Sequence, residues 1–361
     1  MLKKFGDKKK SVLAVVGLFI LFVGIALLYK FYFKPDIQLK TEGKTGNVNV
    51  LILGKGGGRH EGPNLTDTII VATINPNKNT VTLVSIPRDL WIPSLLAKIN
   101  TAYTYGQEKD NQGKLLAKSA VGQVVGKQID YVLVVDFSAF INLVDHLGGI
   151  EVNVRKTLDD YKYPIEGRED DPCDHTEEEI IDLSDQIATG AAKTEDIFPC
   201  RYKHIHFDSG IAHMTGEQAL EFVRSRHGIS GEGSDFARSQ RQQDVINAIS
   251  DKALSLGIIL NPFKVLGVFN IIKDNIDTNA DVREIDDFIN LANKMQGAKI
   301  NSVVLDFGNK TQGRNGLLMH PSISEAQKRQ WVLIPRVGDG NFSEIHEYIR
   351  CVEEKSVCEI N

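Results

Sequence analysis

Residues 131–154 read YVLVVDFSAFINLVDHLGGIEVNV, and this stretch decides the fold class. Tyr131–Asp136 is short, apolar and rich in valine, which is typical of a buried strand. We expect an amphipathic helix from about residue 138 to residue 147, because apolar residues recur there at helical spacing and two glycines follow as a stop signal. Ile150–Val154 is the next expected strand. The order strand, helix, strand predicts an α/β fold.

Three more strands are expected before this stretch, at residues 48–53, 68–74 and 80–86, with a turn at residues 75–79 that joins the last two as a hairpin. A capping box, Thr215-Gly216-Glu217-Gln218, predicts a helix start. Further helices are expected at residues 235–256, 282–296 and 342–353, and strands at residues 302–307 and 331–334. Residues 156–204 are acidic and show no periodicity, so we expect an insertion over the sheet that shapes access to the site.

The N-terminal segment predicts a membrane anchor. Residues 11–33 are almost wholly apolar, close to the ~20 residues that a spanning helix needs. Lysines crowd the first ten residues, so the positive-inside rule places residues 1–10 in the cytoplasm and everything after the anchor outside it. A cleaved signal peptide is the alternative, but the apolar run is long and no small-residue cleavage site follows closely. The expected order is cytoplasmic tail 1–10, anchor 11–33, linker 34–46 and extracytoplasmic domain 47–361.

Composition limits the classes of partner. The net charge is −5 and the isoelectric point is near 6.0, which argues against a nucleic-acid binder, because such domains are strongly basic. The arginines singled out below therefore indicate a local binding site and not a generally basic surface. A domain outside the cytoplasm has no ATP, so any group transfer there requires an already activated donor.

The four cysteines are expected to pair in an exported domain. The simplest connectivity is Cys173 with Cys200 and Cys351 with Cys358. The second pair is too far apart on one unbroken helix, since bridged Cα atoms lie within ~7 Å. Either the helix ends near Glu354 or the pairing is different. A zinc site that combines Cys173 and Cys200 with His175, His204 and His206 is a weaker alternative, because their spacings match no compact ligand motif.

Several arginines occur in segments that do not read as ordinary protein surface. Arg88 follows a hairpin strand, and Arg224 and Arg226 would share one face of an extended segment if the helix ends near Val223. Guanidinium groups donate two parallel hydrogen bonds to phosphate oxygens, so the ligand they predict is a phosphate or pyrophosphate. A solvated charge cluster is the alternative.

Two further groups complete this predicted anion site. Asp235, Arg238 and Gln242 share one helix face, because their spacing is i, i+3 and i+7. Asp67 follows the glycine-rich stretch of residues 54–60 and starts a strand, where a carboxylate can hold Mg²⁺ against a phosphate. A flexible loop and a turn-forming Asp are the alternatives.

Together these residues resemble the LytR-CpsA-Psr family of cell-envelope phosphotransferases. The resemblance runs in order through residues 49–53, 67–70, 85–89, 98–103, 131–154, 216–227, 234–243 and 331–348. It implies a three-layer α/β/α sandwich with a central mixed sheet on a transmembrane helix. It also implies an enzyme that uses Mg²⁺ or Mn²⁺ to transfer a polyprenyl-pyrophosphate-linked anionic glycopolymer, such as a teichoic acid or capsular polysaccharide, to peptidoglycan, with release of polyprenyl phosphate.

The resemblance also assigns roles to residues. Asp67 would bind the metal, and the catalytic set would be Asp67, Arg88, Asp89, Arg224, Arg226 and Asp235. The pyrophosphate would be held by Arg88, Arg224, Arg226, Arg238, Gln242 and Lys98. Asp89 or Asp235 would serve as the base. The implied partners are the lipid-linked glycopolymer, peptidoglycan and the bilayer, with no nucleic acid.

Two positions depart from the family pattern. The family usually has an Asp where this chain has Gly56 and an Arg where it has Leu65. One metal ligand and one phosphate contact are therefore missing, and Asp89, Arg59 or His60 are the candidates to replace them. Two other functions stay open at this point: a hydrolase that cleaves the same pyrophosphate, and a non-catalytic module that binds envelope polymer or lipid.

Overall fold

The computed structural model describes residues 39, 46–56, 64–253, 267, 276–309, 314–322, 331–355 and 358–360. The predicted anchor, residues 11–33, and nearly all of the predicted linker lie outside these residues. Within the described part of the chain, no helix combines the length and the apolar character needed to span a bilayer.

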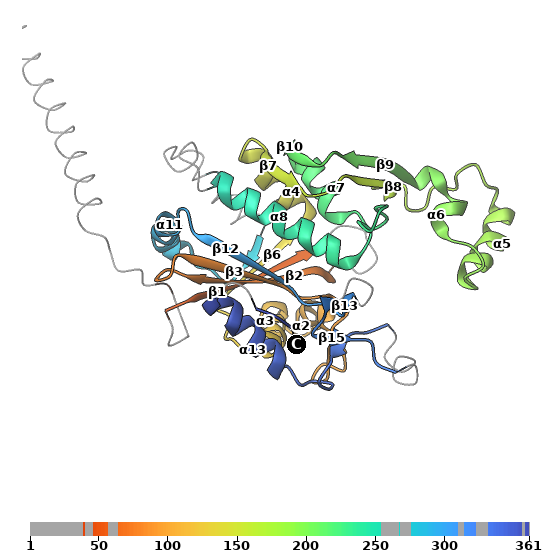
Figure 1. Ribbon diagram of the computed structural model, residues 1–361. Coiled ribbons are helices and arrows are strands. Elements are labelled where there is room, and N and C mark those ends of the chain that lie inside the picture. Colours follow the sequence, from red (N-terminus) through yellow and green to blue (C-terminus); the bar gives the residue numbers. More distant parts are fainter. Residues whose placement is uncertain are drawn as a thin grey trace, which may run out of the picture. The chain divides into compact units, whose positions relative to one another are not determined.

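A six-stranded mixed sheet forms the centre of the domain (Figure 1). Its strands, in spatial order, are β11 (Ile276–Thr278), β6 (Tyr131–Asp136), β1 (Val48–Lys55), β2 (Thr66–Asn75), β3 (Thr80–Ser85) and β12 (Lys299–Val304). β1 runs parallel to β6 and β3 runs parallel to β12, while the other neighbours are antiparallel. The prediction of a mixed α/β fold with a central mixed sheet is confirmed.

One face of the sheet is covered by α2 (Ala102–Glu108), α3 (Gly113–Val125) and α13 (Ser343–Lys355). Their apolar side chains share one buried cluster with the sheet, in which Val121 and Val124 of α3 and Ile349 of α13 pack with Leu51 and Val71 of the strands. This cluster is the main core, because it joins α13, near the C-terminal end of the chain, to the sheet and to α2 and α3, which lie much earlier in the sequence.

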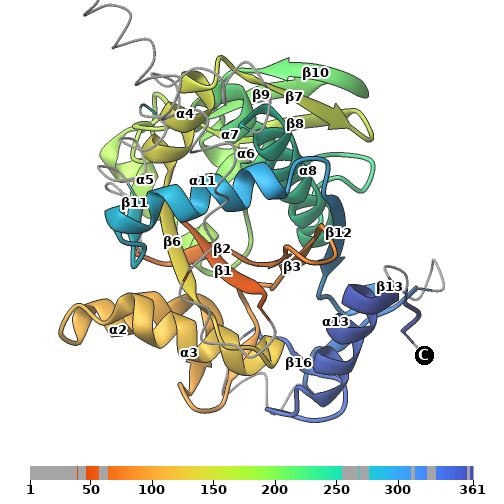
Figure 2. The ribbon, with the colours of Figure 1, turned by 90° about the vertical axis from the view of Figure 1, so that its left-hand side faces the viewer.

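Helices also lie on the opposite side of the sheet (Figure 2): α4 (Phe137–His146), α7 (Gly216–Arg224), α8 (Asp235–Ala253) and α11 (Ile285–Lys294). The ring of Tyr131 lies 5.0 Å from that of Phe288 in α11, in an edge-to-face contact. Gln243 of α8 donates hydrogen bonds of 2.9 Å to the Ser85 hydroxyl and to the Val303 carbonyl. These two bonds fix the middle of α8 against β12 and the end of β3, where the candidate site lies.

The strand-helix-strand stretch forms as predicted but does not end in the central sheet. β7 (Ile150–Val154) pairs with β10 (Gly210–Met214) in a separate two-stranded sheet. Residues of β7 alternate between buried and exposed, with Glu151 and Asn153 exposed. The buried residues of β7, Ile150, Val152 and Val154, pack in a second apolar cluster, and the alternation fits a two-stranded sheet with one face on the core and the other facing solvent. The two glycines before β7 have φ values of 81° and 80°, which stop α4 where the sequence predicts.

The segment 156–204 is more regular than the sequence suggests. It holds β8 (Leu158–Pro164), α5 (Glu177–Ala188) and α6 (Thr194–Ile197), and leads into β9 (Tyr202–Phe207), which pairs with β8. The prediction of an aperiodic segment was wrong, because Thr176 and Glu179 form a capping box that starts α5. The hairpin carries α5 and α6 outward, beyond the end of the sheet, instead of covering it (Figure 1).

Both predicted disulfides are present. The Cα atoms are 5.6 Å apart in Cys173–Cys200 and 6.1 Å apart in Cys351–Cys358. The second bridge forms because α13 ends at Lys355, close to the expected end of the helix. Since Cys173 and Cys200 are bonded to each other, neither supplies a thiolate, and the zinc site that included them was wrong.

The remaining elements are short. They are the pairs β4 (Trp91–Ile92) with β5 (Ala97–Lys98), β13 (Gly308–Asn309) with β14 (Arg314–Asn315) and β15 (Leu318–Met319) with β16 (Ile334–Pro335), and the 3₁₀ turns η1 (Ile99–Thr101), η2 (Pro199–Arg201) and η3 (Val282–Glu284). The strand expected at residues 302–307 lies three residues earlier, as β12, and the strand expected at residues 331–334 is reduced to the two residues of β16.

Candidate active site

The site lies at one end of the central sheet, where β1 and β3 finish and β2 begins. β2 is antiparallel to both neighbours, so its second residue, Asp67, comes next to the carboxyl end of β1 and near Arg88, which follows β3. A Cβ atom on Gly54 would lie 2.9 Å from the Cβ of Thr68, so this position of β1 requires glycine for the strands to close on each other.

Asp67 is bridged by two arginines. Its Oδ1 accepts a hydrogen bond of 2.9 Å from Nη1 of Arg88, and its Oδ2 accepts one of 3.2 Å from Nη2 of Arg226. The Asp67 side chain is 47% exposed, so the bridge opens to solvent. Two guanidinium groups from distant parts of the chain are thus held side by side on one carboxylate.

The electrostatics follow from this bridge. Burial opposes the charge on Asp67, but the ion pairs with Arg88 and Arg226 outweigh it and lower the pKa of the carboxyl group. Burial lowers the pKa of Arg226, and the neighbouring Arg88 lowers it further. The lowered pKa of Asp67 favours its anion, and guanidinium groups keep their charge in proteins, so Asp67 and both arginines are charged at neutral pH. The two arginines repel each other wherever Asp67 does not separate them.

Arg238 adds a third guanidinium from α8. Its side chain is 10% exposed and its Nη2 lies 2.8 Å from Oδ1 of Asp235. Burial and the charge of Arg226 lower the pKa of Arg238 to about 10. A bound anion would reverse this effect, because it would offset the repulsion among the arginines. Gln242, on the same helix face, donates a 3.0 Å hydrogen bond to the Thr68 hydroxyl.

Asp89 and Lys98 form a neighbouring pair. Nζ of Lys98 donates a 2.6 Å hydrogen bond to Oδ1 of Asp89, whose Oδ2 lies 3.5 Å from Nε of Arg88. Asp89 thus lies between Lys98 and Arg88 and contacts both of them. The predicted direct contact of Lys98 with a phosphate requires it to leave Asp89.

Arg224 lies apart from the other arginines. Its guanidinium carbon is 4.0 Å from the centroid of the Phe137 ring and 5.8 Å from that of Tyr163. The predicted helix end near Val223 is within one residue of the observed end of α7 at Arg224, but Arg224 and Arg226 do not share one face, because Arg224 is still the last residue of the helix. Arg224 is helical and Arg226 lies in irregular backbone beyond the helix, so the alternation of a strand does not relate their side chains.

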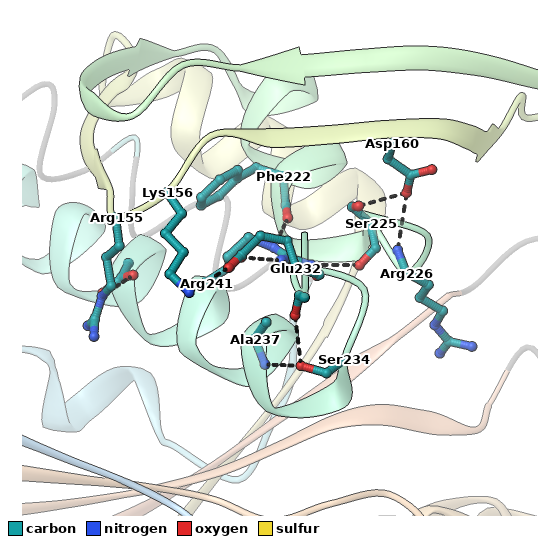
Figure 3. A network of polar contacts seen from close by, with 12 residues as sticks. Arg155, Lys156, Asp160, Phe222, Ser225, Arg226, Glu232, Ser234, Ala237 and Arg241 are labelled. Carbon is teal, nitrogen blue, oxygen red and sulfur yellow. Dashed lines mark hydrogen bonds and ion pairs between the residues drawn. The ribbon is translucent and has the colours of Figure 1, made fainter. Parts of the chain in front are cut away.

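Two residues that the sequence did not single out hold the segment of Arg226 (Figure 3). Oδ2 of Asp160 accepts hydrogen bonds from the Ser225 hydroxyl at 2.7 Å and from the backbone amides of Arg226 at 3.3 Å and His227 at 3.1 Å. Asp160 is fully buried. A signal was present in the sequence, because Asp160 is two residues from Leu158 and so lies on the inward face of a strand.

The second of these residues is Arg241 in α8. It donates hydrogen bonds to the carbonyl oxygens of Phe222 at 2.9 Å, Ser225 at 2.7 Å and Glu232 at 2.7 Å (Figure 3). These bonds tie the end of α7 to the loop that precedes α8. The spacing gave a signal here too, since Arg241 is four residues from Val245 and shares its buried face.

A cavity of about 1020 Å³ opens beside the arginines. Its charged side is lined by Asp67, Arg88, Asp89, Arg226, Asp235, Arg238 and Gln242. Its other side includes Phe307, His320 and Trp331, whose rings are in contact, with centroids 5.1 Å apart for Phe307 and His320 and 4.2 Å apart for His320 and Trp331. No described residue of α4 lines this cavity.

Few carboxylates surround Asp67, the predicted metal ligand. Among the described residues, no group of three His, Cys, Asp or Glu side chains close enough to share a metal ion includes Asp67. Gly56 follows β1 and Leu65 precedes β2, and neither supplies a polar side chain. Arg59 and His60, which were candidates to replace the missing groups, lie outside the described residues.

Comparison with known proteins identifies the family. A model of the LytR_cpsA_psr family matches residues 31–330. The chain belongs to this family.

Relatives of this chain include enzymes named as teichoic acid transferases. The chain is 28% identical over 225 residues to the polyisoprenyl-teichoic acid–peptidoglycan teichoic acid transferase TagV of Bacillus subtilis (strain 168), covering 61% of this chain and 46% of TagV. It is 28% identical over 240 residues to the corresponding transferase TagU of Bacillus mycoides (strain KBAB4), covering 65% of this chain and 61% of TagU. The matches thus span about half the length of these relatives.

The fold is also shared with a solved structure. The crystal structure of B. subtilis TagV superposes with a TM-score of 0.56 at 21% sequence identity, covering 88% of this chain and 100% of that one. At this identity the likeness concerns the fold, a mixed α/β domain with a central mixed sheet.

Proposed function

We propose that this member of the LytR_cpsA_psr family transfers an anionic glycopolymer from a polyprenyl pyrophosphate to peptidoglycan and releases polyprenyl phosphate. The glycopolymer is of the teichoic acid or capsular polysaccharide type. The observation that carries the proposal is the bridge Arg88–Asp67–Arg226 at the edge of the cavity, with Arg238 behind it. Relatives named as teichoic acid transferases support the same reaction class.

The arginines act by binding and neutralising the pyrophosphate. Asp67 holds two guanidinium groups side by side before the donor arrives, and the phosphate oxygens then take over hydrogen bonds that the carboxylate accepts. A hydroxyl oxygen of peptidoglycan attacks the phosphorus that carries the sugar, and the bond from that phosphorus to the bridging oxygen breaks. Charge builds on the leaving polyprenyl phosphate, where Arg88, Arg226 and Arg238 stabilise it.

The base that takes the proton of the attacking hydroxyl is Asp235 in this proposal. Its side chain is 64% exposed, and within the described residues its one ion pair is with Arg238. Asp89 is less available, because Lys98 and Arg88 both contact it and its side chain is only 14% exposed.

Mg²⁺ or Mn²⁺ is the proposed cofactor, and Asp67 would hold it. Each oxygen of Asp67 accepts one guanidinium hydrogen bond, and a carboxylate has about four lone-pair sites, so room for a cation remains. Mg²⁺ is commonly held by one or two carboxylates together with substrate phosphates, so a single Asp fits this use. The bound ion would supply further neutralisation of the pyrophosphate charge.

The membrane placement stays a proposal as well. We infer a single-pass anchor at residues 11–33 with a cytoplasmic N-terminus, supported by the apolar run and the lysines before it. The lipid-linked donor would then lie in the same bilayer as the anchor. The apolar segments at residues 137–147 and 258–269 are candidates to line a slot for the lipid chain, and nearly all of the second segment lies outside the described residues. The aromatic side of the cavity offers an alternative apolar contact for the donor.

The test is a product assay with a synthetic polyprenyl-pyrophosphate-linked glycopolymer and Mg²⁺, run with and without peptidoglycan. We expect polymer bound to peptidoglycan and one polyprenyl phosphate released per transfer, and loss of both products in EDTA. Release of polyprenyl phosphate at the same rate without peptidoglycan would identify a hydrolase instead. Donor binding without turnover in either condition would identify a binding module and refute the transferase.

A further inference from the structure

A second cluster of ligand atoms lies on the outer hairpin, apart from the arginine site. Asp159 of β8 faces His206 of β9 directly across the pair of strands, and His204 is two residues from His206, on the same face. All three side chains are accessible, with exposed fractions of 22% for Asp159, 44% for His204 and 43% for His206. The strand register itself therefore brings two imidazoles and one carboxylate together.

The three side chains converge on one point. Oδ1 of Asp159 lies 3.0 Å from Nε2 of His204 and 2.7 Å from Nδ1 of His206, and all three ligand atoms lie within 4.8 Å of one another. Ligand atoms placed 2.0 to 2.1 Å from a tetrahedral ion are about 3.3 Å apart. The cluster would have to open by only about half an ångström at each contact to admit an ion of this kind.

Neighbouring side chains orient both imidazoles. Nε2 of His206, the nitrogen that faces away from Asp159, lies 3.1 Å from Oδ1 of Asp208. A carboxylate on the far nitrogen is the usual support of a metal-binding histidine, because it fixes the tautomer and raises the basicity of the ligand. The ring of His204 is stacked on Tyr161, with centroids 4.1 Å apart and an interplanar angle of 5°.

From this geometry we propose that Asp159, His204 and His206 form a binding site for a divalent transition-metal ion of the zinc class. Two imidazoles with one carboxylate suit Zn²⁺, Co²⁺ or Ni²⁺, whereas Mg²⁺ prefers oxygen ligands. Three protein ligands leave a fourth position open for water. The site shares no residue with the arginine cluster, so its test is independent of the transferase proposal.

The ion would fasten β8 to β9. Asp159 precedes Asp160, whose carboxylate holds the backbone of Arg226 and His227. The same short piece of β8 thus carries a metal ligand on its outer face and the support of the arginine segment on its inner face. Metal binding would stabilise the hairpin against local opening, since the ligands come from both strands.

Titration of the untagged full chain in detergent with Zn²⁺ alone, in a buffer that contains Mg²⁺, tests the proposal by calorimetry. We expect one equivalent bound, and at least about tenfold weaker binding in His206→Ala and in Asp159→Asn. His213→Ala is the matched control, because His213 is also exposed and also pairs with an acid, Glu151, at 2.7 Å. Its affinity should equal that of the wild type.

Two spectroscopic readouts accompany the titration. Co²⁺ should give the intense visible absorption of a four-coordinate ion in the wild type and lose it in His206→Ala. Zn²⁺ should slow amide hydrogen exchange in β8 and β9 of the wild type and leave His206→Ala unchanged. Undiminished Zn²⁺ binding by a folded His206→Ala chain, or an equal loss in His213→Ala, would overturn the site, as would absence of binding by the wild type at 100-fold molar excess.

Discussion

Asp67 shows how one carboxylate organises the candidate site at the scale of single residues. Its two oxygens hold Arg88 and Arg226, which are separated by more than a hundred positions in the sequence. The sequence predicted that these three residues belong together. It could not predict that Asp67 pairs with the arginines directly, because that contact depends on where β2 begins relative to the ends of β1 and β3.

Replacing Asp67 by Asn removes the charge and keeps the shape. We expect Asp67→Asn to lower kcat by about 100-fold or more, because the arginines lose the group that pre-positions them and the site loses its proposed metal ligand. Unfolding in guanidinium should change by no more than about 1 kcal/mol, since the pair is solvent-exposed. Asp196→Asn, an exposed acid paired with Lys162 on the hairpin, is the control and should leave kcat unchanged. Normal turnover in Asp67→Asn would refute the role of Asp67.

Arginine-to-lysine changes distinguish Arg88, which contacts Asp67, from Arg224, which does not. Arg88→Lys keeps the charge but cannot span Asp67 and Asp89 with a planar fork, so we expect kcat/KM to fall by about 100-fold. Arg224→Lys should cost less than about tenfold, because Arg224 is stacked on Phe137 and away from the bridge. Equal losses in the two variants, measured with the same donor, would show that Arg224 turns into the site during the reaction.

At the scale of elements, the arginine segment owes its position to β8 and α8. Residues 225–227 form no regular structure of their own, and their backbone groups are held by Asp160 from one side and Arg241 from the other. The segment is therefore held by two buried charged residues and not by backbone hydrogen bonds to a neighbouring strand. The sequence predicted the end of α7 to within a residue but not these supports, because they join elements that are distant in the chain.

Asp160→Asn tests this support. Oδ2 of Asp160 accepts from Ser225, Arg226 and His227, and its Oδ1 accepts from the backbone amide of Lys162 at 2.8 Å. An asparagine keeps only one acceptor oxygen, so its NH₂ group would face a backbone N–H donor in either orientation. We expect a loss of about 3 kcal/mol in the free energy of unfolding and at least about tenfold in the affinity of the folded protein for a pyrophosphate donor. Asp182→Asn on α5, an exposed position, should change neither quantity. Reduced stability with wild-type donor affinity would mean that Asp160 supports the fold but not the position of Arg226.

At the scale of the whole domain, two disulfides close loops of different length. Cys173–Cys200 spans 27 residues and Cys351–Cys358 spans 7. From loop-closure entropy, removing the first bridge by paired Cys→Ser substitutions should cost about 3.5 kcal/mol and removing the second about 2.4 kcal/mol. Guanidinium unfolding of the two double mutants measures both. A larger cost for the short loop would show that packing around α13, and not chain entropy, sets the contribution of that bridge.

Several features of this protein follow from the sequence by itself. Local patterns determine four strands of the central sheet, β1, β2, β3 and β6, together with the helix that follows β6, the capping box of α7 and the stop at Gly148 and Gly149, because each depends on a few consecutive residues. The pairing of the cysteines and the choice of arginines and Asp67 as an anion site also follow from residue type and spacing.

The tertiary structure decided the rest. Only the packed chain could place β7 outside the central sheet, separate Arg224 from Arg226, and bring Asp159 opposite His206. Each of these depends on strand register or on the residue at which a helix ends, and a shift of one residue reverses the direction of a side chain. Asp160 and Arg241 are stable as buried charges only because tertiary contacts supply hydrogen-bonding partners from distant segments.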